Sequence, residues 1–186
     1  AHADAVAAVS EAALHAYREY LVTRGLAANS MRVIPTGIEL PPAGNPLRNP
    51  ASGNRPDPQT HAPTLGTVGL RSVKRPERML EMFARVRQQL PSARCLMIGN
   101  AEPEEESRLR SRAADLGISD STQFPGQQRD MDSWYRLLDV YAHTSRSEAL
   151  PKAVLEAMAH SLPVVAFKVG GISEAVTDGE SGFLCK

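Results

Sequence analysis

The sequence predicts an α/β protein with a doubly wound, Rossmann-like parallel sheet that carries helices on both faces. Two observations in residues 64–186 support this prediction. Apolar segments of strand length alternate with amphipathic segments of helix length, in units of roughly 20–30 residues. The apolar segments, such as Pro163–Phe167, also lack the polar alternation of a half-exposed strand. Continuous apolar strands are typical of a parallel sheet that is covered on both sides.

The expected strands follow one another along this part of the chain. They are Leu65–Gly69, Cys95–Ile98, Thr122–Phe124, Val140–Thr144 and Pro163–Phe167. Helices are expected between them, beginning at Pro76, near Glu104, at Ser133 and at Pro151. Proline is tolerated in the first turn of a helix, so Pro76 and Pro151 are natural starting points. The helix after Pro76 should bury a stripe formed by Met79, Leu80, Phe83, Val86 and Leu90.

The N-terminal part differs from the rest in composition. A helix is expected over Ser10–Thr23, with Ser10 as its N-cap and Gly25 as its end, and a strand over Met31–Ile34. Between Pro41 and Pro63 lie half of the 14 prolines, which excludes a helix there and predicts a long loop or linker. The sequence thus divides into 1–40, a loop at 41–63 and a Rossmann-like unit at 64–186.

Composition excludes several classes of function. The 186 residues are 42% hydrophobic and 23% charged, as in an ordinary globular domain. The 21 Lys and Arg balance the 21 Asp and Glu, so nucleic acid is not an expected partner. Two distant cysteines, Cys95 and Cys185, indicate neither a disulfide framework nor a zinc site, which suits a reducing compartment.

Ligands of such sheets bind beyond the carboxyl ends of the strands, so the loops there are the candidate site. In the loop after Thr144, Glu148 lies just before the helix at Pro151 and Glu156 lies in its second turn. The backbone amides of Ala149 and Leu150 would complete an anion site flanked by two carboxylates. Such a site suits a phosphate attached to several hydroxyls. The alternative is a carboxylate that only caps the helix.

The loop after Val68 carries two cations. Arg71 and Lys74 follow Gly69 and precede the helix at Pro76, where they can neutralise a diphosphate leaving group. The loop has neither the Gly and Lys spacing of a Walker loop nor a dinucleotide fingerprint. The alternative is a pair of solvated surface cations. His143, in an apolar strand, is interpreted as a satisfied core histidine.

Several motifs in register resemble one family. They are Glu148 and Glu156 with seven residues between them, Ala157-Met158-Ala159, Pro163-Val164-Val165, Gly170-Gly171, Glu174-Ala175-Val176 and Asp178-Gly179. Upstream, Val33–Ile38 resembles the interdomain segment of the family, Gly69–Pro76 its phosphate loop and Phe124–Gly126 its nucleobase loop. Together they resemble the C-terminal, donor-binding half of the group 1 glycosyltransferases of the GT-B type.

The resemblance implies a retaining sugar transfer from a nucleotide sugar, with a UDP- or GDP-sugar as the expected donor. Arg71, Lys74 and Glu148 would be catalytic: the two cations would bind and stabilise the departing diphosphate, and Glu148 would contact the transferred sugar. The family needs no bound metal or other cofactor, because protein cations replace the metal. This agrees with the absence of a clustered His, Cys or Asp ligand set in the sequence.

The resemblance also implies the residues that bind the donor. Glu156 would hold the ribose hydroxyls, and the amides of Ala149 and Leu150 would face the phosphate and the sugar. Gly69 would belong to the phosphate loop, and the loop around Gln128 would hold the base through its main chain. Three positions depart from the family pattern, with Leu70 in place of Arg, Ala149-Leu150 in place of Gly and an aromatic residue, and Ser161 in place of a left-handed Gly.

Partners and location follow from the same resemblance. The acceptor, a glycan or a lipid, would bind to a first domain, whose last strand resembles residues 1–10. The 186 residues alone are expected to bind nucleotide weakly and to transfer nothing. The expected location is cytoplasmic, including peripheral association with the inner face of the membrane. Two alternatives stand beside this reading: a non-catalytic nucleotide-binding module with a partner chain, and a GT-B-like epimerase.

Overall fold

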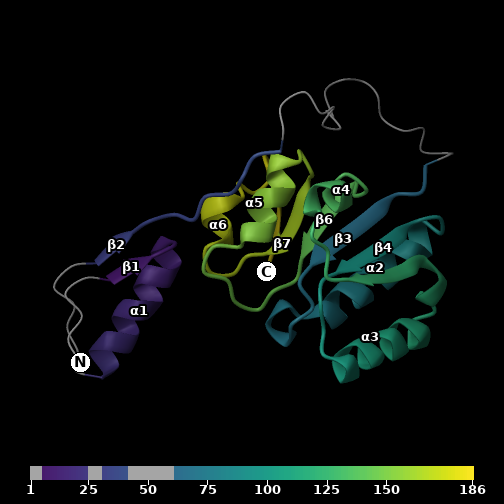
Figure 1. Cartoon of the computed structure of the whole chain (residues 1–186), viewed down its shortest axis with the longest axis horizontal. Helices are drawn as coiled ribbons and strands as arrows, with labels where there is room; N and C mark the ends of the chain where they lie inside the picture. Colours follow the sequence, from purple (N-terminus) through teal and green to yellow (C-terminus); the bar gives the residue numbers. More distant parts are fainter. Residues whose placement is uncertain (1–5, 25–30, 42–60) are drawn as a thin grey trace.

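The main body of the molecule is a six-stranded parallel sheet with the strand order β5-β4-β3-β6-β7-β8. This computed structural model describes residues 6–24, 31–41 and 61–186 (Figure 1). The strands are β3 (Thr64–Val68), β4 (Arg94–Ile98), β5 (Thr122–Gly126), β6 (Val140–His143), β7 (Val164–Phe167) and β8 (Gly182–Cys185). The predicted doubly wound parallel sheet is therefore confirmed, and β8 adds a strand that the sequence analysis did not expect.

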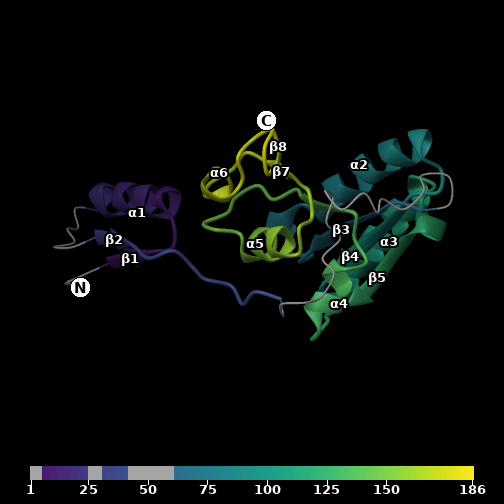
Figure 2. The same ribbon diagram turned by 90° about the horizontal axis from the view of Figure 1, so that it is seen from above.

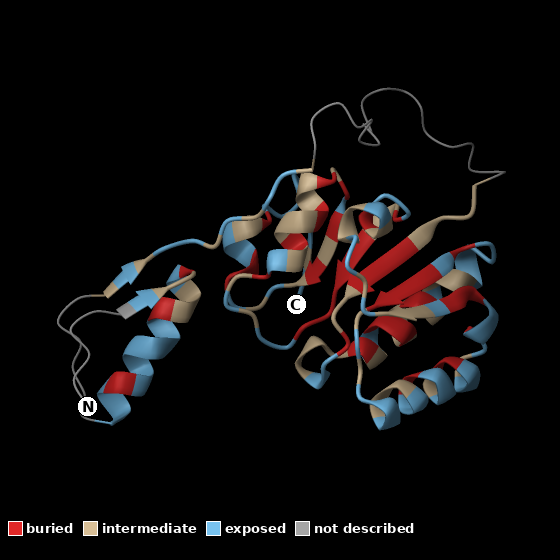
Figure 3. Cartoon of the chain, viewed as in Figure 1, coloured by how far each residue is buried: buried red, intermediate tan, exposed pale blue. Residues whose placement is uncertain are grey.

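Helices cover both faces of this sheet because its strands alternate in the direction of their side chains. In β4, Cys95 and Met97 pack in the cluster that includes α2 (Pro76–Gln89) and α3 (Pro103–Asp115). Leu96 and Ile98 belong to the opposite cluster, under α4 (Met131–Tyr135), α5 (Lys152–Ala159) and α6 (Ile172–Ala175). Figure 3 shows the result, in which the central strands and the inward sides of the helices are buried.

Most expected boundaries lie within a few residues of the observed ones, and the differences have local causes. The expected stripe on α2 is buried at Met79, Leu80 and Phe83. The prediction that Leu90 belongs to this buried stripe is wrong, because the helix ends at Gln89 and Leu90 is 49% exposed. Strand β5 runs through Pro125 rather than ending before it, since a proline is tolerated on the edge strand of a sheet.

The N-terminal segment forms a small separate unit. Strand β1 (Val6–Ala8) pairs in parallel with β2 (Met31–Val33), and α1 (Glu11–Thr23) connects them. Figures 1 and 2 both show this unit to one side of the main sheet. Ser10 is the N-cap of α1, as expected, and its hydroxyl accepts a hydrogen bond from the amide of Ala13. Gly25 and most of the expected loop, residues 42–60, lie outside the described residues.

Hydrogen bonds join this unit to the main body at Ala149 and at Glu174. The Ser10 hydroxyl donates to the carbonyl of Ala149 at 2.7 Å, and Ser10 is buried. The carboxylate of Glu174 in α6 accepts hydrogen bonds from the amides of Glu11 and Ala12, both at 3.0 Å. A carboxylate at this position satisfies free amides in the first turn of α1 and favours its dipole. The start of α1 is thus attached next to the loop that carries Glu148.

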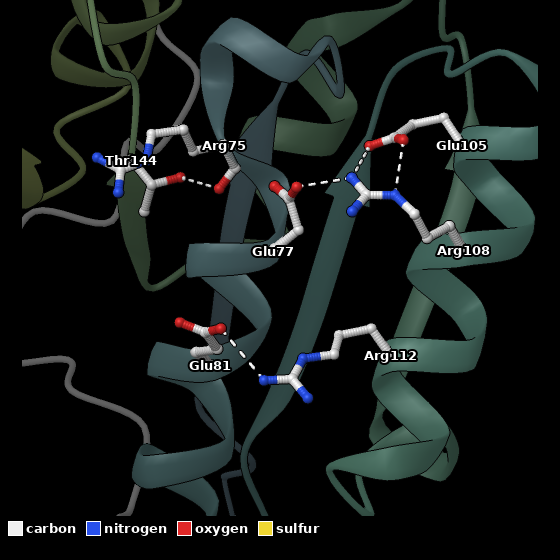
Figure 4. Close-up of polar contacts among 7 residues, drawn as sticks. All are labelled: Arg75, Glu77, Glu81, Glu105, Arg108, Arg112 and Thr144. Atoms are coloured by element: carbon white, nitrogen blue, oxygen red, sulfur yellow. Dashed lines mark hydrogen bonds and ion pairs between the residues drawn. The ribbon is translucent and has the colours of Figure 1, made fainter.

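An ion-pair network on the surface joins α2 to α3 (Figure 4). The Arg108 guanidinium contacts Glu105 at 2.7 Å and Glu77 at 2.6 Å, and Arg112 contacts Glu81 at 3.2 Å. Partial burial raises the pKa of Glu77, but hydrogen bonding together with the positive charges of Arg108 and Arg75 outweighs it and holds that pKa below its usual value. Exposed pairs of this kind stabilise weakly, so the buried contacts between these helices and the sheet dominate.

In the described ranges, no helix combines the length and apolar character needed to cross a lipid bilayer.

Candidate functional site

The candidate site lies where the winding of the sheet reverses. Strands β3 and β6 are neighbours at the centre of the sheet. The helix that follows β3 belongs to one core cluster, and the helix that follows β6 belongs to the other. In doubly wound sheets such a switch point is where ligands bind, because the two loops diverge there. The loops at 69–75 and 144–151 are therefore brought together, as the sequence analysis required.

Thr144, at the end of β6, holds the first loop against the second. Its hydroxyl lies 2.9 Å from the carbonyl oxygen of Lys74. It also lies 3.1 Å from the carbonyl oxygen of Arg75, a contact that Figure 4 shows. The amide of Arg146 donates to the carbonyl of Val73 at 2.9 Å. Arg75 adopts a left-handed conformation, with φ of 51°, which ends the short 3-10 turn Ser72–Lys74 and starts α2. Three main-chain carbonyls around Lys74 are thus attached to the loop of Glu148.

The Glu148 carboxylate is the centre of the site. Its Oε1 atom accepts from Lys74 Nζ at 2.5 Å, from the Ser145 hydroxyl at 2.5 Å and from His143 Nε2 at 2.9 Å. The Glu148 side chain is only 10% exposed. Burial raises the pKa of Glu148, but the hydrogen bonds from His143, Lys74 and Ser145 outweigh it and lower that pKa to about 2. Glu148 is therefore charged at neutral pH. Among the described residues, no group is bonded to its Oε2 atom.

His143 is a site residue that the sequence analysis interpreted as part of the core. It is buried, as expected, with 1% exposure, yet its Nε2 contacts Glu148. Its Nδ1 lies 3.3 Å from the hydroxyl of Tyr141 on the same strand. The sequence signal that could have identified His143 as a site residue was the position of an imidazole at the carboxyl end of an otherwise apolar strand. Spacing alone could not show that this ring lies against a carboxylate.

Glu156 lies in the second turn of α5, as expected, and a tyrosine orients it. The Tyr135 hydroxyl donates to Glu156 Oε2 at 2.9 Å, and Lys152 Nζ lies 3.6 Å from Oε1. Burial raises the pKa of Tyr141, and the charges of Glu148 and Glu156 raise it further. Tyr141 is thus near both carboxylates, and its ring centroid lies 6.1 Å from that of Tyr135. The sequence analysis had not named Tyr135 among the site residues.

The backbone around Glu148 and Ala149 is supported by two glycines. The amide of Gly171 donates to the carbonyl of Glu148 at 3.1 Å. A Cβ on Gly170 would lie 1.8 Å from the Glu148 carbonyl oxygen, and one on Gly171 would lie 1.8 Å from that of Ala149. No side chain fits there, so the two glycines allow the loop after β7 to lie directly against the backbone of Glu148 and Ala149. Among the described residues, the amides of Ala149 and Leu150 have no hydrogen-bond partner.

The remaining expected residues have different surroundings. Arg71 is exposed and has no ion-pair partner in the described part of the chain, whereas the adjacent Leu70 is buried in the core. Of the two expected cations, Lys74 forms an ion pair with Glu148, whereas no ion pair between Arg71 and Glu148 is found among the described residues. Gly69 has a φ of 89° and donates its amide to Ile98 at 2.8 Å. Gln128 donates to the carbonyl of Pro125 at 2.7 Å, which stabilises the loop after the edge strand β5.

Metal ligands are not clustered in the described ranges, where no group of three or more His, Cys, Asp or Glu side chains is arranged to hold a metal ion.

Comparison with known proteins identifies a family whose model matches most of the chain. The family model described as "Glycosyl transferases group 1" matches residues 55–186. A D-inositol 3-phosphate glycosyltransferase of Streptosporangium roseum is 33% identical over 180 residues, which cover 90% of this chain and 40% of that protein. The chain therefore spans well under half of this curated relative.

Two solved structures have the same fold over nearly the whole chain. The HepE protein of Anabaena, in complex with UDP-glucose, has a TM-score of 0.78 at 24% identity, covering 99% of this chain and 50% of that one. Sucrose-phosphate synthase of Thermosynechococcus elongatus has a TM-score of 0.76 at 27% identity, covering 98% and 45%. In both, the matching region is about half of the solved chain.

Proposed function

Because the chain belongs to the group 1 glycosyl transferases of the GT-B type, we propose that it is the donor-binding half of a retaining glycosyltransferase. The reaction moves a sugar from a nucleotide-sugar donor to an acceptor hydroxyl and releases the nucleoside diphosphate. The acceptor, a glycan or a lipid, binds to a first domain. The same proposal places the protein in the cytoplasm and includes peripheral association with the inner face of the membrane.

One observation carries the proposal: Lys74 and Glu148, from loops on either side of the switch point, meet at 2.5 Å. Lys74 supplies a positive charge where the diphosphate leaves, and it interacts most strongly as negative charge develops. Arg71, which is exposed, adds charge at the edge of the same loop. The amides of Ala149 and Leu150 are positioned to donate to the phosphate or the sugar.

The remaining donor contacts follow from the geometry of the two carboxylates. Glu148 keeps Oε2 for the hydroxyls of the transferred sugar, while Glu156, oriented by Tyr135, accepts from the ribose hydroxyls. The loop that contains Gln128 holds the base, and Gly69 keeps the phosphate loop close to the end of β4. In this mechanism protein cations neutralise the diphosphate, so no cofactor is part of the proposal. The proposed donors are UDP- and GDP-sugars.

A non-catalytic nucleotide-binding module is the second candidate. It requires the same diphosphate and ribose contacts but no contact to the sugar. Glu148 distinguishes the two candidates. A module that binds only a nucleotide does not require a charged, nearly buried carboxylate beside Lys74, the cation proposed to bind the diphosphate.

The test is a thermal-shift screen of the chain with UDP-, GDP- and ADP-sugars, followed by calorimetry with the best one. We expect one nucleotide class to stabilise the wild-type chain, since a ligand that binds only the native state raises its stability. Glu156→Ala should weaken that binding, whereas Glu180→Ala, a matched exposed carboxylate outside the site, should not. Absence of binding by the wild type, or equal affinity in Glu156→Ala, would contradict the proposal.

A further inference from the structure

The three hydrogen bonds to Glu148 Oε1 differ in how freely their donors can move. Lys74 ends in a flexible ammonium group that is 18% exposed, and in the proposed function it also serves the diphosphate. Ser145 is a hydroxyl that can rotate. His143 is a rigid ring with 1% exposure, attached to the central part of the sheet. A bound diphosphate would compete for Lys74, whereas His143 is buried away from solvent.

The surroundings of His143 also determine which nitrogen carries the proton. Its Nε2 must donate to Glu148, because a charged carboxylate only accepts hydrogen bonds. In the neutral ring, Nδ1 is then an acceptor, and the hydroxyl of Tyr141 at 3.3 Å is its donor. The backbone of Val68 and the side chain of Thr67, both in β3, also lie near the Tyr141 hydroxyl and lower its pKa against the larger effect of burial. These hydrogen bonds connect Tyr141 through His143 to the Glu148 carboxylate.

We propose that His143, held by Tyr141, is a positioning residue that keeps Glu148 in place when Lys74 turns to the donor diphosphate. The inference rests on the proposed function, because it assumes that Glu148 contacts the transferred sugar. It concerns the sugar and not the nucleotide, since the hydrogen bonds of His143 join it to Glu148 and Tyr141, whereas Lys74 and Glu156 are the residues proposed to bind the nucleotide. A loss of sugar binding without a loss of nucleotide binding distinguishes a positioning role from a general structural one.

The experiment compares the affinities of the chain for UDP-glucose and UDP, or for GDP-mannose and GDP, by calorimetry. We expect His143→Leu to weaken nucleotide-sugar binding by about tenfold and to leave nucleoside diphosphate binding unchanged. His143→Gln, which retains a donor at the same reach, should restore most of the loss, and Tyr141→Phe should give a smaller loss of the same kind. Equal losses for both ligands, or no loss for the nucleotide sugar, would overturn the proposal.

A double-mutant cycle tests whether His143 acts through Glu148. In the Glu148→Gln background, His143→Leu should cause no further loss of nucleotide-sugar affinity, and additive losses would contradict the inference. His61→Gln is the matched control, because His61 also contacts a carboxylate, Asp139 at 2.7 Å, but before the start of β3, at the opposite end of the strands from Glu148. It should change neither affinity.

A second readout does not depend on donor binding. Titration of the Glu148 carboxyl followed by carbon-13 NMR should show its pKa raised in His143→Leu and largely restored in His143→Gln. A pKa that does not move in His143→Leu would overturn the inference by itself. If the wild type binds neither ligand, the proposed function fails, and this titration still decides whether His143 holds Glu148.

Discussion

Lys74 Nζ lies 2.5 Å from Glu148 Oε1, although the two residues are 74 positions apart in the chain. Both side chains are mostly buried, with 18% and 10% exposure. The pair forms because Lys74 and Glu148 follow neighbouring strands at the switch point of the sheet. It is the contact that most directly joins the fold to the proposed chemistry.

The stability of the protein should depend on pH through Glu148. Its pKa in the folded state is about 2, below the ordinary value of 4.5. A lowered pKa contributes stability that is present above the unfolded value and is lost as the pH falls through the folded one. Between about pH 5 and pH 2, the wild type should therefore lose on the order of 2–3 kcal/mol that Glu148→Gln does not lose. Urea unfolding of both proteins over this range measures it, and parallel pH profiles would rule it out.

Replacement of Lys74 should impair transfer more than replacement of Arg71. Lys74→Ala removes the charge beside Glu148, and we expect kcat for sugar transfer to fall by roughly 100-fold or more with the acceptor domain present. Arg71→Ala removes an exposed cation, so its effect should be smaller and should diminish with added salt. Steady-state kinetics of the two variants at low and high salt provide the comparison. Equal losses would mean that both cations contact the diphosphate, and an unchanged kcat in Lys74→Ala would remove its proposed role.

Gly171→Ala should destabilise the fold by about 2 kcal/mol or more, because overpacking forces the backbone apart. The new Cβ would lie 1.8 Å from the carbonyl oxygen of Ala149, and the φ of Gly171 is −75°, so only steric contact is tested. Gly37→Ala is the control, since a Cβ there meets nothing within 4 Å. Denaturant unfolding should give a change within about 0.5 kcal/mol for the control. A Gly171→Ala protein as stable as the control would show that the loop can move aside.

Ser161→Gly should stabilise the protein. Ser161 has a φ of 56°, the left-handed conformation expected at this helix end, where a side chain costs energy. Glycine removes that cost but adds freedom to the unfolded chain, which leaves a net gain of about 0.5–1 kcal/mol. Thermal and urea unfolding measure the gain. Ser161→Ala keeps a Cβ and should show none, so a similar gain in both variants would refute the explanation.

Much of the fold could be predicted because its signals are local. Apolar runs, Pro76 at a helix start and Ser10 as an N-cap each act within a few residues. The edge strand β8 was missed because its side chains are partly exposed, with Phe183 at 64%, so its pattern differs from that of a buried strand. The meeting of the loops of Lys74 and Glu148 was also predictable, since the carboxyl ends of adjacent parallel strands share one edge of the sheet.

The order of residues by itself determined most of the strands and helices and the two loops that carry charge. Only the packed structure decided which side chains meet there: it placed Lys74, Ser145 and His143 on one oxygen of Glu148, left Arg71 at the surface, and joined Glu174 to the start of α1. Local propensities act over a few residues, whereas hydrogen bonds between distant segments depend on how the strands and helices pack. That packing is a property of the whole chain, so no single motif could reveal it.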